Sequence, residues 1–162
     1  MPKTATVPAN MTPRKPPPAQ KAGKGKYLFK MAGLKSVEAG PEYSTAHGAV
    51  VEGERFMFGL LRMPKGTGAA AHHHPNEQWV YIIEGELAFE IDGKKGVARP
   101  GSLLYIPPNA VHSTLAAPDR DAVFLTGKDL SHGLWGKPVD AKAGPRRAKP
   151  APRAKTPARR KR

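Results

Sequence analysis

The sequence predicts an all-β domain, folded as a sandwich or barrel, between two basic tails. Short runs rich in β-branched and aromatic residues alternate with turn signals through the middle of the chain. No helical period of apolar residues persists for three turns. Charge and proline content both distinguish the two ends of the chain from this middle segment. The net charge of +14 on the 162 residues comes from the two ends.

The two tails differ sharply in composition from the segment between them. Residues 1–26 contain six basic and no acidic side chains, and residues 141–162 contain ten basic and none. The segment 27–140 has a net charge of −2, which excludes a basic globular domain of the ribosomal type. In the first tail, Pro16-Pro17-Pro18 favours extended geometry and Gly23 and Gly25 add flexibility. The second tail lacks the apolar bulk to offset the entropy of ordering. We therefore expect disordered tails at 1–26 and 141–162 around one domain at 27–140.

Seven strand candidates follow one another through this domain, each ended by residues that favour a turn. The Asp92-Gly93 pair is the strongest of these signals, since it is typical of a two-residue hairpin. A stretch around His47-Gly48 has no strand pattern and is interpreted as a loop. In chain order the candidates are 55–63 before Pro64-Lys65-Gly66, 79–83 before Glu84-Gly85, 87–91 before Asp92-Gly93, 96–99 before Pro100-Gly101, 102–106 before Pro107-Pro108-Asn109, 110–115 before Pro118-Asp119, and 122–126.

Some classes of protein are excluded or disfavoured by what the sequence lacks. No run approaches the roughly 18–20 apolar residues that a membrane span needs. With no cysteine, the chain has no disulfide framework and no thiolate metal site. Because the first residues also lack an apolar secretory stretch, we expect a cytoplasmic protein.

A run of histidines is the main chemical signal. On a strand, residues two apart share a face, so His72 and His74 can face one ion while His73 turns away. A turn after His74 would bring the amide oxygen of Gln78 back toward them, and His112 can add a third nitrogen. Such donors suit Fe, Mn, Ni, Zn or Cu. A surface histidine cluster without a ligand role would have the same spacing.

Two stretches resemble the paired motifs of the cupin family. The first runs from Gly66 through His72-His73-His74-Pro75-Asn76-Glu77-Gln78 to Gly85, and the second from Gly101 through Pro107-Pro108-Asn109-Ala110-Val111-His112. Their order and separation also match, over roughly residues 55–126. The resemblance implies a double-stranded β-helix, or jelly-roll barrel, with one divalent metal ion inside. The ligands that it implies are His72, His74, Gln78 and His112.

Two positions depart from the usual motifs. Gln78 replaces the usual glutamate, as in some metal-binding cupins, including small cupins of uronate breakdown that this sequence resembles around the motifs. A divalent ion without a carboxylate ligand keeps its full charge, favours an anionic or bidentate oxygen substrate, and is held less tightly. Asn109 replaces the usual glycine and tolerates left-handed geometry better than most residues. Glu77 would face away from Gln78 on a strand.

One strand candidate is apolar on both faces. Trp79, Tyr81 and Ile83 alternate with Val80 and Ile82. We interpret the aromatic face as core or subunit interface, rather than substrate lining, because aromatic residues dominate both.

We therefore expect a single-domain, metal-binding cupin, assembled as a homodimer. It would act on a small oxygen-rich metabolite by isomerase, lyase or oxygenase chemistry, but the spacing assigns no catalytic acid or base. The alternative is a non-catalytic module that senses a metabolite in its barrel. In that case the tail 141–162 would bind nucleic acid or another polyanion through its basic charge, although a solubilising extension would have the same composition.

Overall fold

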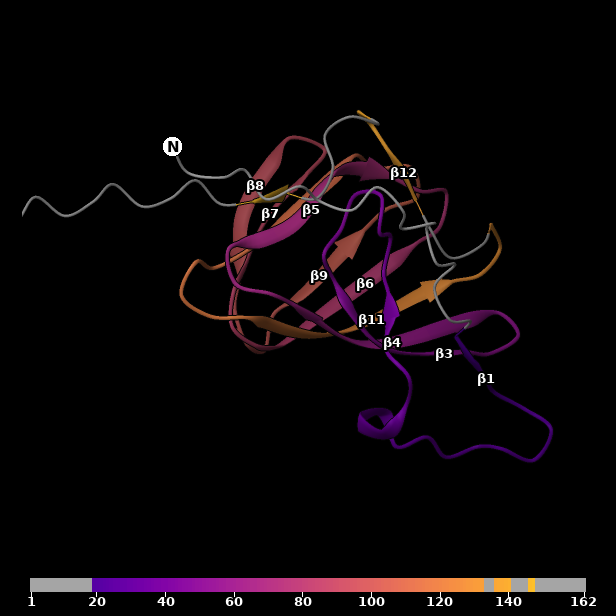
Figure 1. Ribbon diagram of the computed structural model, residues 1–162. Helices are drawn as coiled ribbons and strands as arrows, with labels where there is room; N and C mark the ends of the chain where they lie inside the picture. The colour runs from indigo at the N-terminus through magenta and orange to yellow at the C-terminus, as the bar shows by residue number, and fades with distance from the viewer. Residues whose placement is uncertain (1–18, 133–135, 141–145, 148–162) are drawn as a thin grey trace, which may run out of the picture.

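The computed structural model describes residues 19–132, 136–140 and 146–147. These residues form thirteen strands and one 3-10 turn, η1 (Met31–Gly33). The strands make two sheets that face each other across the interior (Figure 1). This confirms the predicted all-β jelly-roll fold. Within the described part of the chain, no helix is long and apolar enough to cross a membrane.

The first sheet has seven strands in the order β1-β3-β4-β11-β6-β9, with β2 beside β3. Its pairs are antiparallel except β1 with β3, which is parallel. The strands are β1 (Gln20–Lys21), β2 (Val37–Glu38), β3 (His47–Glu52), β4 (Phe56–Met63), β6 (Gln78–Glu84), β9 (Leu103–Ile106) and β11 (Ala122–Asp129).

The second sheet has six strands in the order β12-β5-β10-β7-β8, with β13 also beside β5. All of its pairs are antiparallel. The strands are β5 (Thr67–His73), β7 (Leu87–Ile91), β8 (Lys94–Ala98), β10 (His112–Ala116), β12 (Lys137–Pro138) and β13 (Arg146–Arg147). Strand β5 therefore has β10 on one edge and the two short C-terminal strands on the other.

Alternation along the strands builds the core between the sheets. On β4, Met57, Gly59, Leu61 and Met63 are buried, while the residues that alternate with them lie nearer the surface. On β6, Val80 and Ile82 are buried in the same way. Burying alternate apolar side chains from both sheets is the main stabilising contribution in a fold of this type.

Two turns have the backbone conformation that the sequence indicates. Asp92 and Gly93 have φ values of 45° and 78°, as a two-residue type I′ hairpin between β7 and β8 requires. Asn109, before β10, has a φ of 63°, in the left-handed region that asparagine tolerates.

The structure differs from the expected elements at several places. Strands β2, β5 and β12 were not among the seven strand candidates. His47 begins β3 and does not lie in a loop. Strand β11 continues three residues past the expected end at Thr126, to Asp129. Short strands β1 and β13 lie inside the segments predicted as tails, and each pairs with a strand of the barrel. Of the segments predicted as tails, residues 1–18, 141–145 and 148–162 fall outside the described residues.

Candidate metal centre

Three histidines meet inside the barrel from neighbouring elements. His72 on β5 lies directly opposite His112 on β10, and His74 follows the end of β5. All three are buried, and ligand nitrogens of the three rings lie within 4.8 Å of one another. The backbone N–H of Asn109 donates to the carbonyl oxygen of His74 at 2.7 Å, which ties the turn before β10 to the end of β5. These three side chains could hold a metal ion.

Each imidazole is oriented by a hydrogen bond to a backbone carbonyl two residues away. The Nδ1 atoms of His72, His74 and His112 lie 2.8, 2.9 and 2.9 Å from the carbonyl oxygens of Ala70, Asn76 and Ala110. A carbonyl oxygen only accepts, so each Nδ1 carries the ring proton and donates it. Each Nε2 is then left with a free lone pair, which is the arrangement found in metal-binding histidines.

The three rings are neutral at physiological pH. Burial lowers the pKa of His72 to about 2 and that of His112 to about 4, and it also lowers the pKa of His74. The positive charge of Lys128 lowers the pKa of all three further. Because metal ligands must be deprotonated, these rings are ready to bind an ion.

Gln78, at the start of β6, completes the group. Its Nε2 donates to the hydroxyl of Thr126 at 3.0 Å, and that hydroxyl donates to the carbonyl oxygen of Trp79 at 3.1 Å. This chain of donors turns Gln78 Oε1 toward Nε2 of His74, 2.9 Å away. With the His74 proton on Nδ1, two lone pairs face each other. A cation bound to both atoms would remove this repulsion, so the donor set fits a metal ion.

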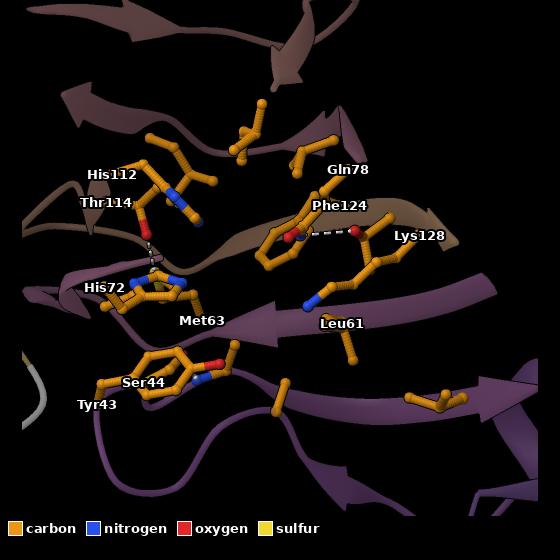
Figure 2. Close-up of a pocket in the computed structure, with 18 of the residues that line it drawn as sticks. Tyr43, Ser44, Leu61, Met63, His72, Gln78, His112, Thr114, Phe124 and Lys128 are labelled. Atoms are coloured by element: carbon orange, nitrogen blue, oxygen red, sulfur yellow. Dashed lines mark hydrogen bonds between the residues drawn. The ribbon is translucent and has the colours of Figure 1, made fainter. Parts of the chain in front are cut away.

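A cavity of about 80 Å³ lies beside these groups. Tyr43 stacks on His72 with ring centroids 4.0 Å apart, and its hydroxyl accepts a hydrogen bond of 2.9 Å from the backbone of Gly136. Figure 2 shows Tyr43, His72 and His112 along one side of the pocket, with Lys128 reaching in from the other side in this view. The aromatic ring of Tyr43 therefore restricts the orientation of His72.

Lys128 is a buried cation in the wall of this cavity. Only 5% of the residue is exposed, and burial lowers its pKa to about 8. It still carries a positive charge at neutral pH. Its neighbour Asp129 lies on the opposite face of β11, where its carboxylate accepts hydrogen bonds from the backbone N–H groups of Glu77 and Ser131.

The structure brings together all four residues that the sequence picked out, His72, His74, Gln78 and His112. Glu77 turns away, and its carboxylate accepts a hydrogen bond from Trp79 Nε1 at 2.7 Å. Sequence reasoning missed Tyr43, for which no signal is evident. It also missed Lys128, which the alternation of Phe124, Thr126 and Lys128 along one face would have indicated.

Two facing, mostly antiparallel sheets with a buried three-histidine group between them define a jelly-roll barrel with a candidate metal centre. The family model for the cupin domain matches residues 59–127, which include both histidine motifs. Residues 59–127 therefore form a cupin domain.

Curated relatives match over short segments. An acireductone dioxygenase from Bacillus thuringiensis (strain Al Hakam) is 34% identical over 59 residues, 33% of this chain and 35% of that protein. The quercetin 2,3-dioxygenase of Bacillus subtilis (strain 168) is 35% identical over 51 residues, 31% of this chain and 15% of that protein. In the acireductone dioxygenase and two further curated relatives, the matched segment spans only 13% to 44% of the relative's own length.

A solved structure shows the same fold over most of its length. It is an RmlC-like cupin from Shewanella frigidimarina, with a TM-score of 0.55 at 19% identity. The similarity covers 65% of this chain and 91% of that one.

Proposed function

We propose that the protein is a metal-dependent enzyme that acts on a small oxygen-containing metabolite. In this proposal His72, His74, Gln78 and His112 hold one divalent ion, which is iron, manganese, nickel, zinc or copper. The supporting observation is that four neutral donor atoms, three histidine Nε2 atoms and the Oε1 of Gln78, lie close together. The other nitrogen of each histidine ring and the amide nitrogen of Gln78 are already hydrogen-bonded. When bound, such an ion supplies a Lewis acid for substrate oxygens, or an oxygen-binding centre if it is iron.

Among the reaction classes that the sequence leaves open, we favour an oxygenase. Two of the relatives with similar segments are, by name, dioxygenases. The matched segments cover a third or less of this chain. The substrate and the reaction of the whole protein are therefore part of the proposal.

The residues of the chain would prepare the site in two ways. The carbonyl partners of the histidine rings fix the direction of each Nε2, and the stacked ring of Tyr43 restricts His72 further. Apolar side chains such as Leu61 and Phe124 line the cavity and limit the water beside the ligands. Because all four donors are neutral, a divalent ion would keep its full charge and attract anionic substrate oxygens.

Metal analysis of the untagged protein tests the proposal. We expect about one divalent ion per chain, lost when His74→Ala removes a donor. His73→Ala is the matched control, because His73 is the neighbouring residue, at the end of β5, but lies outside the histidine group that could bind a metal. Equal metal loss from both variants, or metal-free wild-type protein after reconstitution with each candidate ion, would contradict the assignment.

Oxygen consumption separates the reaction classes. An oxygenase loaded with metal should take up oxygen only when a substrate is present. Turnover at an unchanged rate under nitrogen would instead indicate lyase or isomerase chemistry. Mass spectrometry of molecules that copurify with the protein supplies the first candidate substrates for this assay.

The second candidate function is a metabolite sensor that attaches to a polyanion. The observation that favours it is the ten basic and no acidic residues in 141–162, which lie outside the described residues except for β13. A sensor would bind its ligand without turnover. Deletion of 148–162, which leaves β13 in place, should then weaken DNA binding at low salt and leave metal content unchanged.

We also propose that two copies of the chain pair through the outer face of the first sheet. Residues paired in register across β4, β11, β6 and β9 form rows on this face. One row is Phe58, Gly127, Trp79 and Tyr105, and the next row is Leu60, Leu125, Tyr81 and Leu103. We call the exposed apolar residues here the outer face: Phe56, Phe58, Trp79, Tyr81, Ile83, Leu103, Tyr105 and Leu125.

The size of the outer face supports a second copy as its partner. Each of its residues is between 37% and 57% exposed. At about 150–250 Å² per large side chain, they expose on the order of 700 Å² of surface. This exceeds the patch of about 300–600 Å² typical of a monomer and approaches the roughly 800 Å² that each partner buries in a stable interface.

A further inference from the structure

Lys128 projects into the cavity on the same face of β11 as Phe124 and Thr126. It pairs in register with Gln78 on β6, so its strand position is next to that of the candidate ligand. Figure 2 shows its Nζ in the interior of the pocket, among the side chains that line it. Its charge also reaches the three buried histidines.

The rest of the lining is apolar or uncharged. Apolar side chains make most of the wall, among them Leu61, Met63, Val80, Ile106 and Phe124. The described residues that line the cavity include no aspartate or glutamate. A ligand in this cavity therefore meets one fixed positive charge, a few polar atoms near the histidines, and apolar surface elsewhere.

We propose that Lys128 binds the carboxylate of the substrate, and that the substrate is a short-chain carboxylic acid with an apolar body. The ammonium group would pair with the carboxylate, while a further oxygen of the acid would lie toward the histidines. A polyhydroxylated acid fits poorly, because its hydroxyl groups would be buried against apolar walls without partners. This inference rests on the proposed function, in that the same cavity is taken as the substrate site.

The size of the cavity restricts the acid to a few carbons. Its volume of about 80 Å³ is well below the ~300 Å³ or more of pockets that hold drug-sized ligands. The role given to Lys128 needs charge rather than metal ligation. The preference for an acid should therefore persist in protein stripped of metal.

Paired probes test the role of Lys128. We would measure by calorimetry the binding of formate, acetate, propanoate and butanoate, each against its own amide, and of glucuronate as the polyhydroxylated acid. Wild-type protein should bind at least one short acid about 10- to 100-fold more tightly than its amide, the range expected for a hydrogen bond to a charged group. Glucuronate should bind more weakly than that acid. Lys128→Met should remove the preference, and Lys128→Arg should keep part of it.

The controls separate this inference from the metal proposal. Lys94→Met removes an exposed lysine on β8 and should leave the preference unchanged. Metal-free wild-type protein that prefers acids would support the role of Lys128 even if no metal site exists. The absence of any acid preference in wild-type protein, or its full retention in Lys128→Met, would overturn the inference. Tighter binding of glucuronate would overturn the apolar substrate class alone.

Discussion

The chemistry of the site depends on how single residues hold or release protons. His72, His74 and His112 each donate Nδ1–H to a carbonyl two residues away. Burial keeps the rings neutral, so the three Nε2 lone pairs are available to bind an ion. The same burial makes the site sensitive to acid.

The stability of the metal-free protein should fall with pH below about 6.5, the usual pKa of an exposed histidine. The folded pKa is about 2 for His72 and about 4 for His112, so below pH 6.5 the unfolded chain binds protons that the folded chain excludes. For each of these two histidines, the free energy of unfolding should fall by about 1.4 kcal/mol for each unit by which the pH is lowered. This loss continues until the pH reaches the pKa of that histidine in the folded protein. Urea titrations at pH 7.5, 6.5 and 5.5 measure this slope. His72→Gln should reduce the slope, and a slope unchanged from that of the wild-type protein would contradict the account.

Gln78→Glu should raise the affinity for metal. The change keeps the shape of the side chain and adds a negative charge beside the ion, so we expect an increase of about tenfold or more, or about 1.4 kcal/mol. Competition with a chelator measures the change. Any activity on an anionic substrate should decline, because the charge of the ion is reduced. Gln20→Glu on β1 is the control, and a loss of affinity in Gln78→Glu would show that Gln78 is not a ligand.

At the residue scale, the proximity of these side chains could be predicted only where local spacing determines it. His72 and His74 share a strand face, and Gln78 returns to them after one turn, so short-range geometry is enough. Tyr43 reaches His72 through a tertiary contact that no local pattern records. Lys128 was missed because the strand was expected to end at Thr126, whereas it continues to Asp129.

At the scale of elements, the site depends on the close approach of β5 and β10. The register between the two strands shifts between His112 and Thr114, a β-bulge or irregularity next to a candidate ligand. Bulges of this kind redirect side chains near functional sites. On β5, Gly68 lies against the β10 backbone, where an added Cβ would be 2.0 Å from the carbonyl oxygen of Thr114. No other residue fits there without moving a strand.

Gly68→Ala should therefore destabilise the barrel and disturb the pairing of His72 with His112. We expect a loss of about 2 kcal/mol or more in the free energy of unfolding, together with reduced metal content. Gly33→Ala is the matched control, because an added Cβ at Gly33 meets no atom within 4 Å. Chemical denaturation and metal analysis of the two variants make the comparison. Equal stability of both would show that β10 moves aside easily.

Most strands were predictable because turn residues mark their ends. The seven candidates correspond to β4, β6, β7, β8, β9, β10 and β11, with bounds shifted by up to three residues. The missed strands have a different cause. Strand β3 begins with His47-Gly48, and β5 consists mostly of small residues and histidines, so neither has an apolar pattern. Strands β1, β2, β12 and β13 are two residues long. These strands form by pairing with a partner strand and not by local preference.

At the scale of the molecule, the two sheets expose different surfaces. The outer face on the first sheet consists of eight large apolar residues. The other sheet presents charged residues such as Lys94 and Lys95 on β8. This difference is the basis for predicting which face joins two copies.

Tyr81→Glu should convert the proposed dimer into a monomer. The change places a charge in the centre of the outer face, where pairing would bury it. Sedimentation velocity of wild-type and variant protein measures the assembly. Val97→Glu is the control, since Val97 is exposed to a similar extent, 46%, but lies on the other sheet. A wild-type monomer at micromolar concentration, or a dimer that persists in Tyr81→Glu, would contradict this interface.

The pairing of β5 has a practical consequence for how the chain can be shortened. Strand β5 carries His72, and its outer edge is paired with β12 at His72 and His73 and with β13 at Thr67 and Gly68. A chain cut after Leu130 would leave that edge open, and an open edge recruits strands from other molecules. Truncated versions made for crystallisation should therefore end beyond Arg147. Those that end earlier should aggregate on concentration even though the barrel itself is intact.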